Sequence, residues 1–116
     1  MRLGAVALMV PGWDAGIAFY VNGLDFDLVE DRNEGRKRWV TVRAAPGETL
    51  IVLAVGADRP PDRVAYFMET DDFAREAARI EAAGGRFEEA PRIEDYGTEA
   101  VWRDPFGNRW DLIQRA

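Results

Sequence analysis

Hydrophobic and polar residues alternate with a period of two in several short stretches of the chain, a pattern typical of half-buried strands. The first stretch predicts a strand at 3–10. A helical period of apolar residues follows at 14–22, where Asp14 is placed to cap the first turn. Three more stretches predict the strands that complete this half of the chain, namely 26–31, 38–44 and 49–55.

The second half of the chain repeats this order of elements. A strand is predicted at 63–69, followed by a helix at 72–83 that begins at Thr70 or Asp71 and ends at a glycine pair. Three short strands come next, at 86–89, 99–103 and 109–114. The apolar patterns of the two halves match at an offset of about sixty residues, which indicates an internal repeat.

The segment that joins the halves, DRPPDR at 58–63, is predicted to be a linker because consecutive prolines disfavour helices and central strands. The pattern therefore predicts an α+β fold. It consists of one domain over 1–116, made of two βαβββ modules at about 1–57 and 63–116.

Composition and charge narrow the range of partners. The chain has 116 residues and a formal net charge of −6, which disfavours nucleic acid and anionic membranes as binding partners. It contains no apolar run of transmembrane length and no leader pattern, so we expect a soluble, cytoplasmic protein. There is no cysteine, histidine or serine, which excludes thiol chemistry, histidine acid–base chemistry and a serine triad.

Two motifs give the repeat a family resemblance. The first is FY…GLDF near the end of the first helix, and the second is DPFGNRWDLIQ at the end of the chain. With the paired βαβββ modules, these motifs resemble the vicinal oxygen chelate superfamily of glyoxalase I, extradiol dioxygenases and bleomycin-resistance proteins. The resemblance implies a cupped mixed sheet around a cleft, with helices outside, and a homodimer in which two subunits complete the clefts.

The resemblance also places the family's metal ligands on this sequence. The corresponding positions are Ala5, Ile51, Ala65 and Asp111, and three of them have no side chain that could bind a metal. A divalent ion ordinarily needs three or four protein ligands, so we expect no metal and no other cofactor. A weak carboxylate site made of other acids together with Asp111, namely Glu69 and Glu99, is left open.

Strand alternation sorts the side chains between the helix layer and the cleft. Trp102, Trp110 and Leu112 are expected to face the helices, and Ile51 and Leu53 to face the cleft. The residues expected to bind a ligand combine aromatic and charged side chains. They are Trp39, Phe67, Glu69, Tyr96, Arg103 and Asp111.

An apolar concavity with acids and aromatic rings suits a small aromatic or cationic molecule. Metal-independent binding of such a molecule, without catalysis, is the favoured function. The alternative is a lyase, isomerase or dioxygenase type of enzyme that uses Asp111 and Glu69 as catalytic residues, with or without a divalent metal.

Structural roles remain open for the same residues. Asp111 could pair with Arg43 or Arg109, and Glu69 could be solvated. Tyr96 could anchor its loop, and Trp39 could fill a dimer interface.

Overall fold

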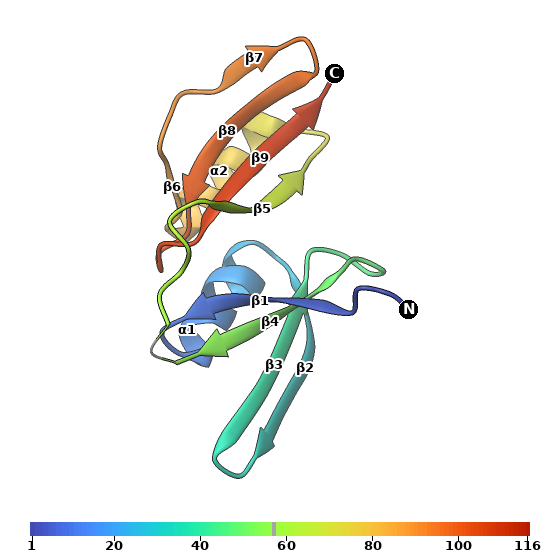
Figure 1. Ribbon diagram of the computed structural model, residues 1–116. Helices are drawn as coiled ribbons and strands as arrows, with labels where there is room; N and C mark the ends of the chain where they lie inside the picture. Colours follow the sequence, from blue (N-terminus) through green and yellow to red (C-terminus); the bar gives the residue numbers. More distant parts are fainter. Residues whose placement is uncertain (57) are drawn as a thin grey trace. The chain divides into compact units, whose positions relative to one another are not determined.

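A computed structural model describes residues 1–56 and 58–116. The chain divides into two compact units, Met1–Arg59 and Pro60–Ala116, which are coloured blue to green and green to red in Figure 1. The division falls inside the predicted linker. Residue 57, the predicted end of the first module, lies outside the described residues.

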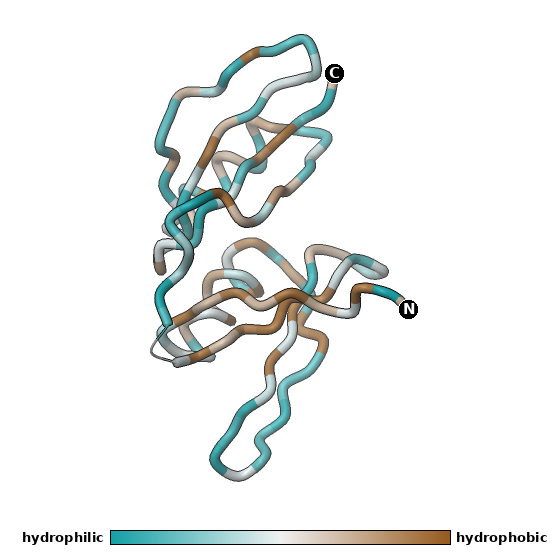
Figure 2. The backbone as a smooth tube through the Cα atoms, in the orientation of Figure 1, coloured by the Kyte–Doolittle hydropathy of each residue, from teal (hydrophilic) through white to brown (hydrophobic). Residues whose placement is uncertain are grey.

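The first unit has the predicted order of elements. They are β1 (Ala5–Val10), α1 (Trp13–Ile17), η1 (Ala18–Gly23), β2 (Asp27–Glu34), β3 (Lys37–Arg43) and β4 (Leu50–Val55). The strands form one mixed sheet in the order β1-β4-β3-β2, in which β1 and β4 are parallel and the other pairs are antiparallel. The far end of the β2–β3 hairpin is hydrophilic, whereas β1 and β4 are largely hydrophobic (Figure 2).

The helix of the first unit differs from the prediction. It begins at Trp13 after Gly12, and it continues from α1 into a π-helical segment. Asp14 caps nothing, because its carboxylate instead accepts a hydrogen bond from Arg38 Nη1 on β3 at 2.7 Å. A long-range ion pair has therefore replaced the local capping bond that the sequence suggested.

The second unit repeats the module. Its elements are β5 (Val64–Glu69), α2 (Phe73–Ala83), β6 (Arg86–Phe87), β7 (Arg92–Glu94), β8 (Gly97–Arg103) and β9 (Arg109–Arg115). They form a mixed sheet in the order β5-β9-β8-β6, with β7 paired to β8. The prediction of an α+β fold made of two βαβββ modules is confirmed, and β7 is an addition that the sequence did not reveal.

Helix α2 begins one residue later than predicted. Its N-cap is Asp72, whose side chain accepts a hydrogen bond from the backbone N–H of Arg75 at 3.2 Å. The Thr70 hydroxyl accepts a bond from the Asp72 N–H at 3.1 Å, so it supports the cap instead of forming it. Gly84 ends the helix in the left-handed region, with a φ of 114°.

Helix α2 covers one face of the second sheet (Figure 1). The rings of Trp102 and Trp110 stack on this face with their centroids 5.4 Å apart. A Cβ placed on Gly85, just after the helix, would lie 2.5 Å from Ile80 and 3.3 Å from Trp102, which shows how closely this layer packs. The prediction that both tryptophans face the helix is confirmed.

The corresponding layer of the first unit corrects a prediction. A Cβ on Gly16 of α1 would lie 2.9 Å from Leu53 Cδ1, so Leu53 and its strand neighbour Ile51 face the helix. The expectation that they face the cleft is wrong. In the first unit Ala7 pairs with Val52, whereas in the second unit Phe67, the counterpart of Ala7, pairs with Asp111. The offset between the two modules is therefore 59 residues at this strand (111 − 52) instead of the 60 residues that separate Ala7 from Phe67, and a shift of one residue exchanges the two faces of a strand.

Among the described residues, no helix is long and apolar enough to cross a membrane.

Candidate functional site

The second sheet has an open face, which is the face opposite α2. Three neighbouring strands contribute side chains to it at one level, because Asp111 on β9 pairs with Phe67 on β5 and with Val101 on β8. Asp111 is only 7% exposed, whereas Phe67 is 69% exposed. A buried carboxyl group therefore lies next to an exposed aromatic ring.

Asp111 is held next to a second acid. Its carboxyl group is within hydrogen-bonding reach of Glu99 on β8, and Oδ1 of Asp111 accepts no hydrogen bond from the described part of the chain. Burial raises the pKa of Asp111 to about 6, and the neighbouring Glu99 adds to the rise. Two carboxylates can bond to each other only when one carries a proton, and Asp111 is the one that takes it.

Glu99 is the partner that stays ionised. The Tyr96 hydroxyl donates a short hydrogen bond to Glu99 Oε1, and Arg92 Nη1 donates to the same oxygen at 3.0 Å. The bond from Tyr96 above all keeps the pKa of Glu99 below its usual range, with smaller contributions from Asp111 and Arg92. The same bond raises the pKa of Tyr96, because it stabilises the protonated phenol and a phenolate could not donate it.

A third acid completes what we call the acid cluster, namely Glu89, Arg92, Tyr96, Glu99 and Asp111. Glu89 pairs with Arg92 at 3.0 Å and accepts a hydrogen bond from the backbone N–H of Val101 at 2.8 Å. Arg92 thus bridges two carboxylates and is already occupied. The cluster has three carboxylates and one guanidinium, so an excess of negative charge surrounds Asp111 when its carboxyl group is ionised.

Sequence reasoning identified only part of this cluster. Tyr96 and Asp111 were predicted as ligand-binding residues and Glu99 as an acid on the same face, whereas Arg92 and Glu89 were missed. The missed signal is the turn at 95–96, which folds the short strand β7 back onto β8 and brings Arg92 opposite Glu99.

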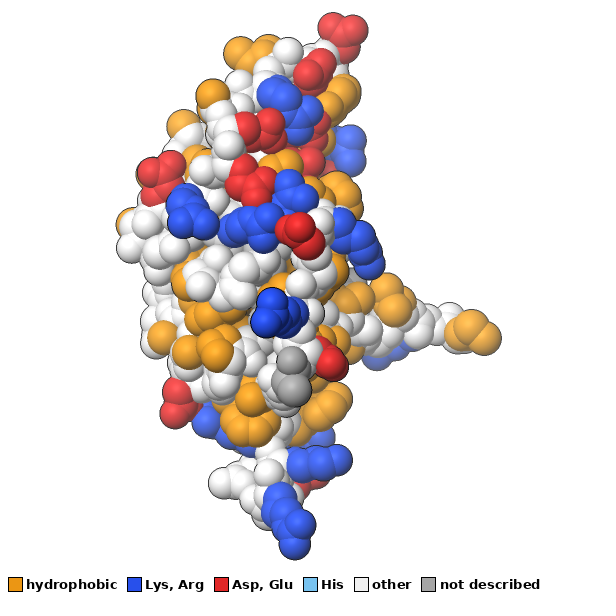
Figure 3. All heavy atoms as spheres, turned by 60° about the vertical axis from the view of Figure 1, so that its left-hand side comes forward, with side chains coloured by type: hydrophobic (Ala, Val, Ile, Leu, Met, Phe, Trp, Pro, Cys, Tyr) orange, Lys and Arg blue, Asp and Glu red, His pale blue; other side chains and the backbone are white. Residues whose placement is uncertain are grey.

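Arg103 lies in a separate network at one end of β8. It donates to Glu88 at 2.5 Å and to Asp62 at 2.9 Å, and Glu88 also binds Arg109 at 2.7 Å. Figure 3 shows acidic and basic side chains side by side on the surface of the second unit. Among the residues that the structure describes, the suggested pairing of Asp111 with Arg109 is therefore not found, and Arg43 pairs with Asp27 inside the first unit at 3.2 Å.

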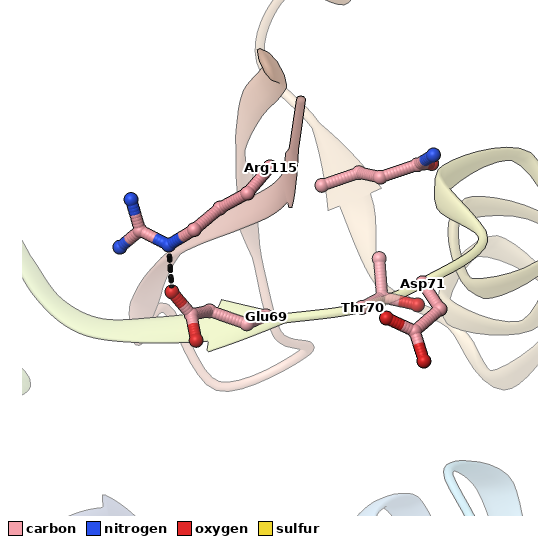
Figure 4. Close-up of a pocket in the computed structure, with 5 residues that line it drawn as sticks. Glu69, Thr70, Asp71 and Arg115 are labelled. Atoms are coloured by element: carbon pink, nitrogen blue, oxygen red, sulfur yellow. Dashed lines mark hydrogen bonds and ion pairs between the residues drawn. The ribbon is translucent and has the colours of Figure 1, made fainter. Parts of the chain in front are cut away.

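Glu69 lies at the end of β5, where it lines a surface pocket of about 270 Å³ with Thr70, Asp71, Gln114 and Arg115. Figure 4 shows Glu69 and Arg115 pointing toward each other across one side of this pocket, joined by a hydrogen bond. Glu69 is engaged here and has no hydrogen bond to the acid cluster among the described residues. Of the two predicted catalytic acids, Asp111 is buried and the pKa of its carboxyl group is raised, whereas Glu69 lies at the surface in an ion pair with Arg115.

The first unit has a different hydrogen-bonded group on its sheet, namely Glu30, Trp39 and Thr41. Trp39 Nε1 donates to Glu30 Oε2 at 2.8 Å, and the buried Thr41 hydroxyl donates to the same oxygen at 3.0 Å. These two bonds, that of Trp39 first, keep the pKa of Glu30 below its usual range. Trp39 is 39% exposed, so a hydrogen bond sets the orientation of its indole while part of the residue stays available for contact.

The side chains at the family's metal positions do not fit a divalent ion. Asp111 is the one position of the four with a donor atom, and its counterpart in the first unit is Val52 instead of the predicted Ile51. Within residues 1–56 and 58–116, no group of three acids is arranged to hold a metal. Asp111 and Glu99 supply two carboxyl groups, and Glu99 is already bound by Arg92, so the pair falls short of the three or four ligands that a divalent ion ordinarily needs.

Two βαβββ modules, each with a parallel pairing of its first and last strands, define the protein as a vicinal oxygen chelate fold. Residues 2–112 match the Glyoxalase/Bleomycin resistance protein/Dioxygenase superfamily. The chain belongs to this superfamily, as the repeat and the closing DPFGN turn predict.

Similar proteins share the fold over the whole chain. An uncharacterized protein from Shewanella frigidimarina (strain NCIMB 400) is 40% identical over 121 residues, which cover 94% of this chain and 90% of that protein. The crystal structure of UcmS2 has a TM-score of 0.83 and 28% identity over 97% of each chain. TnmS3, an antibiotic binding protein from Streptomyces sp. CB03234, has a TM-score of 0.83 and 26% identity, over 100% of this chain and 97% of its own.

Proposed function

We propose that this protein binds a small aromatic or cationic molecule without a metal ion and without chemical turnover. The observation that carries the proposal is the placement of the buried Asp111 carboxyl group, whose Oδ1 accepts no hydrogen bond within the described chain, beside the exposed Phe67 ring. Buried acceptors are ordinarily satisfied, so an oxygen of this kind favours a donor from a ligand.

The surroundings of Asp111 support a ligand of this class. An exposed ring offers apolar area and a negative π face to an aromatic or cationic group. The similarity to TnmS3, an antibiotic binding protein, supports small-molecule binding over catalysis.

Titration of the isotope-labelled protein with a panel of aromatic and cationic compounds, followed by NMR, tests the proposal. Saturable shifts are expected at Phe67, Tyr96 and Asp111. Phe67→Ala should weaken binding about tenfold, since an aromatic contact contributes roughly 1 kcal/mol or more. The matched control is Ile93→Ala, an exposed apolar residue of β7 that should leave binding unchanged. A panel without any saturable response contradicts the proposal.

Metal independence has its own measurement. Elemental analysis after loading with manganese, nickel, zinc and iron is expected to show less than stoichiometric metal, and ligand affinity should be the same with and without a chelator. A tightly held stoichiometric ion would contradict this part of the proposal and would make Asp111 the first ligand to replace.

A second candidate function is a metal-independent enzyme, such as an isomerase or lyase, with Asp111 as general base. The observation that favours it is the pKa of Asp111, which lies near 6 and therefore suits proton transfer close to neutral pH. Screening for turnover of the ligands found by NMR tests this candidate. An activity that survives Asp111→Asn unchanged would exclude Asp111 as the base.

We also propose a homodimer, as the family resemblance implies. Large exposed apolar side chains support it, among them Leu28 and Val29 on the edge strand β2. Light scattering is expected to give twice the 13.0 kDa mass of the chain. A monomer at all protein concentrations would exclude the dimer.

A further inference from the structure

The surface pocket of the second unit lies where β5 and β9 end and α2 begins. The two strands are parallel neighbours, so the residues at their C-terminal ends meet at one edge of the sheet. The volume of about 270 Å³ is below the roughly 300 Å³ at which pockets for drug-sized ligands begin, so a smaller molecule fits. The lining consists of polar side chains, which suits a ligand with charged or hydrogen-bonding groups. They are Glu69, Thr70, Asp71, Gln114 and Arg115.

Backbone N–H groups at the start of α2 are already bound within the chain. The Asp72 N–H donates to the Thr70 hydroxyl at 3.1 Å. The Phe73 N–H donates to Gln114 Oε1 at 2.7 Å, and the Arg75 N–H donates to the Asp72 carboxylate at 3.2 Å. Recognition of a ligand in the pocket therefore depends on its side chains and not on the end of the helix.

Gln114 has a fixed orientation at this pocket. Its Oε1 accepts the Phe73 N–H, and this bond assigns the other branch of the amide to Nε2. The described residues offer Nε2 no acceptor. Gln114 thus supplies N–H donors to the pocket while its oxygen holds α2.

Arg115 and Glu69 form an ion pair on one side of the pocket (Figure 4). The bond joins Arg115 Nε to Glu69 Oε1, so both Nη groups of the guanidinium lack an acceptor in the part of the chain that the structure describes. The side chains are 66% and 58% exposed, and an exposed ion pair contributes little to stability. A ligand carboxylate can therefore bind the guanidinium through two parallel N–H groups without breaking a strong contact.

Asp71 lies beside Thr70, on the side of the pocket away from Arg115 (Figure 4). Within residues 1–56 and 58–116 its carboxylate has no ion-pair or hydrogen-bond partner. An ammonium group is the charge-assisted donor that suits such an acceptor. The lining thus presents unused N–H donors on Arg115 and Gln114 and an unused carboxylate on Asp71.

We propose that this pocket binds a small zwitterion of the α-amino acid type. Arg115 and Gln114 bind its carboxylate, and Asp71 binds its ammonium group. A ligand with one of these charges alone would leave either the guanidinium or Asp71 without a partner. The pocket is a second site, because it shares no residue with the acid cluster and takes a ligand of a different class from that of the proposed function.

Three probes with the same neutral side chain separate the two charges. L-Glutamine carries both, L-glutamine amide lacks the carboxylate, and N-acetyl-L-glutamine lacks the ammonium group. Each is titrated into the isotope-labelled full-length protein and followed by NMR at about pH 6, where the amino groups of the probes are protonated and their carboxyl groups are ionised. A set of other neutral L-amino acids is titrated in the same way.

L-Glutamine is expected to give saturable shifts at Thr70, Asp71 and Arg115. It should bind about tenfold more tightly than either derivative, because each derivative loses one charge-assisted contact. Asp71→Asn and Arg115→Gln should each weaken its binding about tenfold. Arg115→Gln should not weaken the amide further, since the amide already lacks the group that Arg115 binds.

Matched controls remove the same charges elsewhere in the second unit. Glu81→Gln changes an exposed acid of α2, and Arg86→Gln changes an exposed arginine of β6. Both variants should bind L-glutamine as the parent protein does. A loss of affinity in the controls equal to that in Asp71→Asn and Arg115→Gln would overturn the proposal, because net charge alone would then explain the binding.

The remaining outcomes are also decisive. If the amide binds as tightly as L-glutamine, the pocket is a cation site, and if the N-acetyl derivative does so, it is an anion site; either result overturns the proposal. The absence of a saturable response to any of the amino acids at millimolar concentrations overturns it as well. None of these results decides the proposed function, which is tested with other compounds at Phe67, Tyr96 and Asp111.

Discussion

Trp39 donates its indole N–H to Oε2 of Glu30 at 2.8 Å, and this bond fixes a ring that is not held by burial. Glu30→Ala removes the acceptor, so the ring should become mobile. Exchange of the Trp39 Nε1 proton with solvent is expected to accelerate several-fold, as measured by NMR. Glu34→Ala, an acid near the tip of the same hairpin, is the control and should leave this exchange unchanged. An exchange rate that Glu30→Ala does not alter would show that packing alone holds the ring.

The turn before β9 depends on one buried carboxylate. Asp104 accepts hydrogen bonds from the backbone N–H groups of Phe106 and Asn108 and from the Asn108 side chain, at 2.8 to 2.9 Å. Asp104→Ala leaves these donors buried without their acceptor and should lower the free energy of unfolding by about 2–4 kcal/mol in a urea titration. Asp62→Ala, which removes an exposed ion-pair partner of Arg103, should leave it nearly unchanged. Equal effects of the two changes would contradict this account.

The hairpin that carries Tyr96 depends on a glycine. Gly97 has a φ of 145°, and a Cβ there would lie 2.1 Å from the backbone oxygen of Gln114 on β9. Gly97→Ala is therefore expected to cost more than about 4 kcal/mol or to prevent folding, because backbone of a paired strand cannot move aside. Gly4→Ala, where nothing lies within 4 Å, should change stability by at most about 0.5 kcal/mol. A Gly97→Ala protein as stable as the Gly4→Ala control would contradict the close approach.

Stability should depend on pH through Asp111. Its pKa is raised to about 6 in the folded protein, so the folded state binds the proton more tightly than the unfolded chain does. The resulting stabilisation is fully present below the ordinary pKa of an aspartate and is lost as the pH rises through about 6. Asp111→Asn has no such loss. Its free energy of unfolding relative to the parent protein should therefore rise by roughly 2 kcal/mol between about pH 4 and about pH 8. A difference that stays constant with pH would contradict the raised pKa.

The local pattern predicted much of the fold. The strand at 3–10, the helix at 72–83 and the strand at 109–114 lie within two residues of β1, α2 and β9, because each combines an unambiguous period with turn or capping residues at its ends. The face of Asp111 was also predictable, since Trp110 and Leu112 occupy the alternate positions of β9 and are buried against the helix layer.

The errors arose where distant residues compete with local signals. Asp14 has the chemistry of an N-cap and binds Arg38 instead. Ile51 and Leu53 were assigned to the wrong face, because the offset between the modules changes by one residue at β4 and a continuous run of apolar residues does not reveal such a shift. Strand β7 is too short to show a period and is formed by its pairing with β8.

The sequence by itself determined the repeated βαβββ order, the superfamily and the absence of donors at three of the four metal positions, since periodicity, turn chemistry and residue type are local properties. Only the tertiary structure decided what Asp111 does. Its pKa, its unfilled oxygen and its exposed ring neighbour depend on Glu99, Arg92 and Phe67, which come from three other strands. Burial and Coulomb interactions are set by distances between strands, and a linear sequence does not contain these distances.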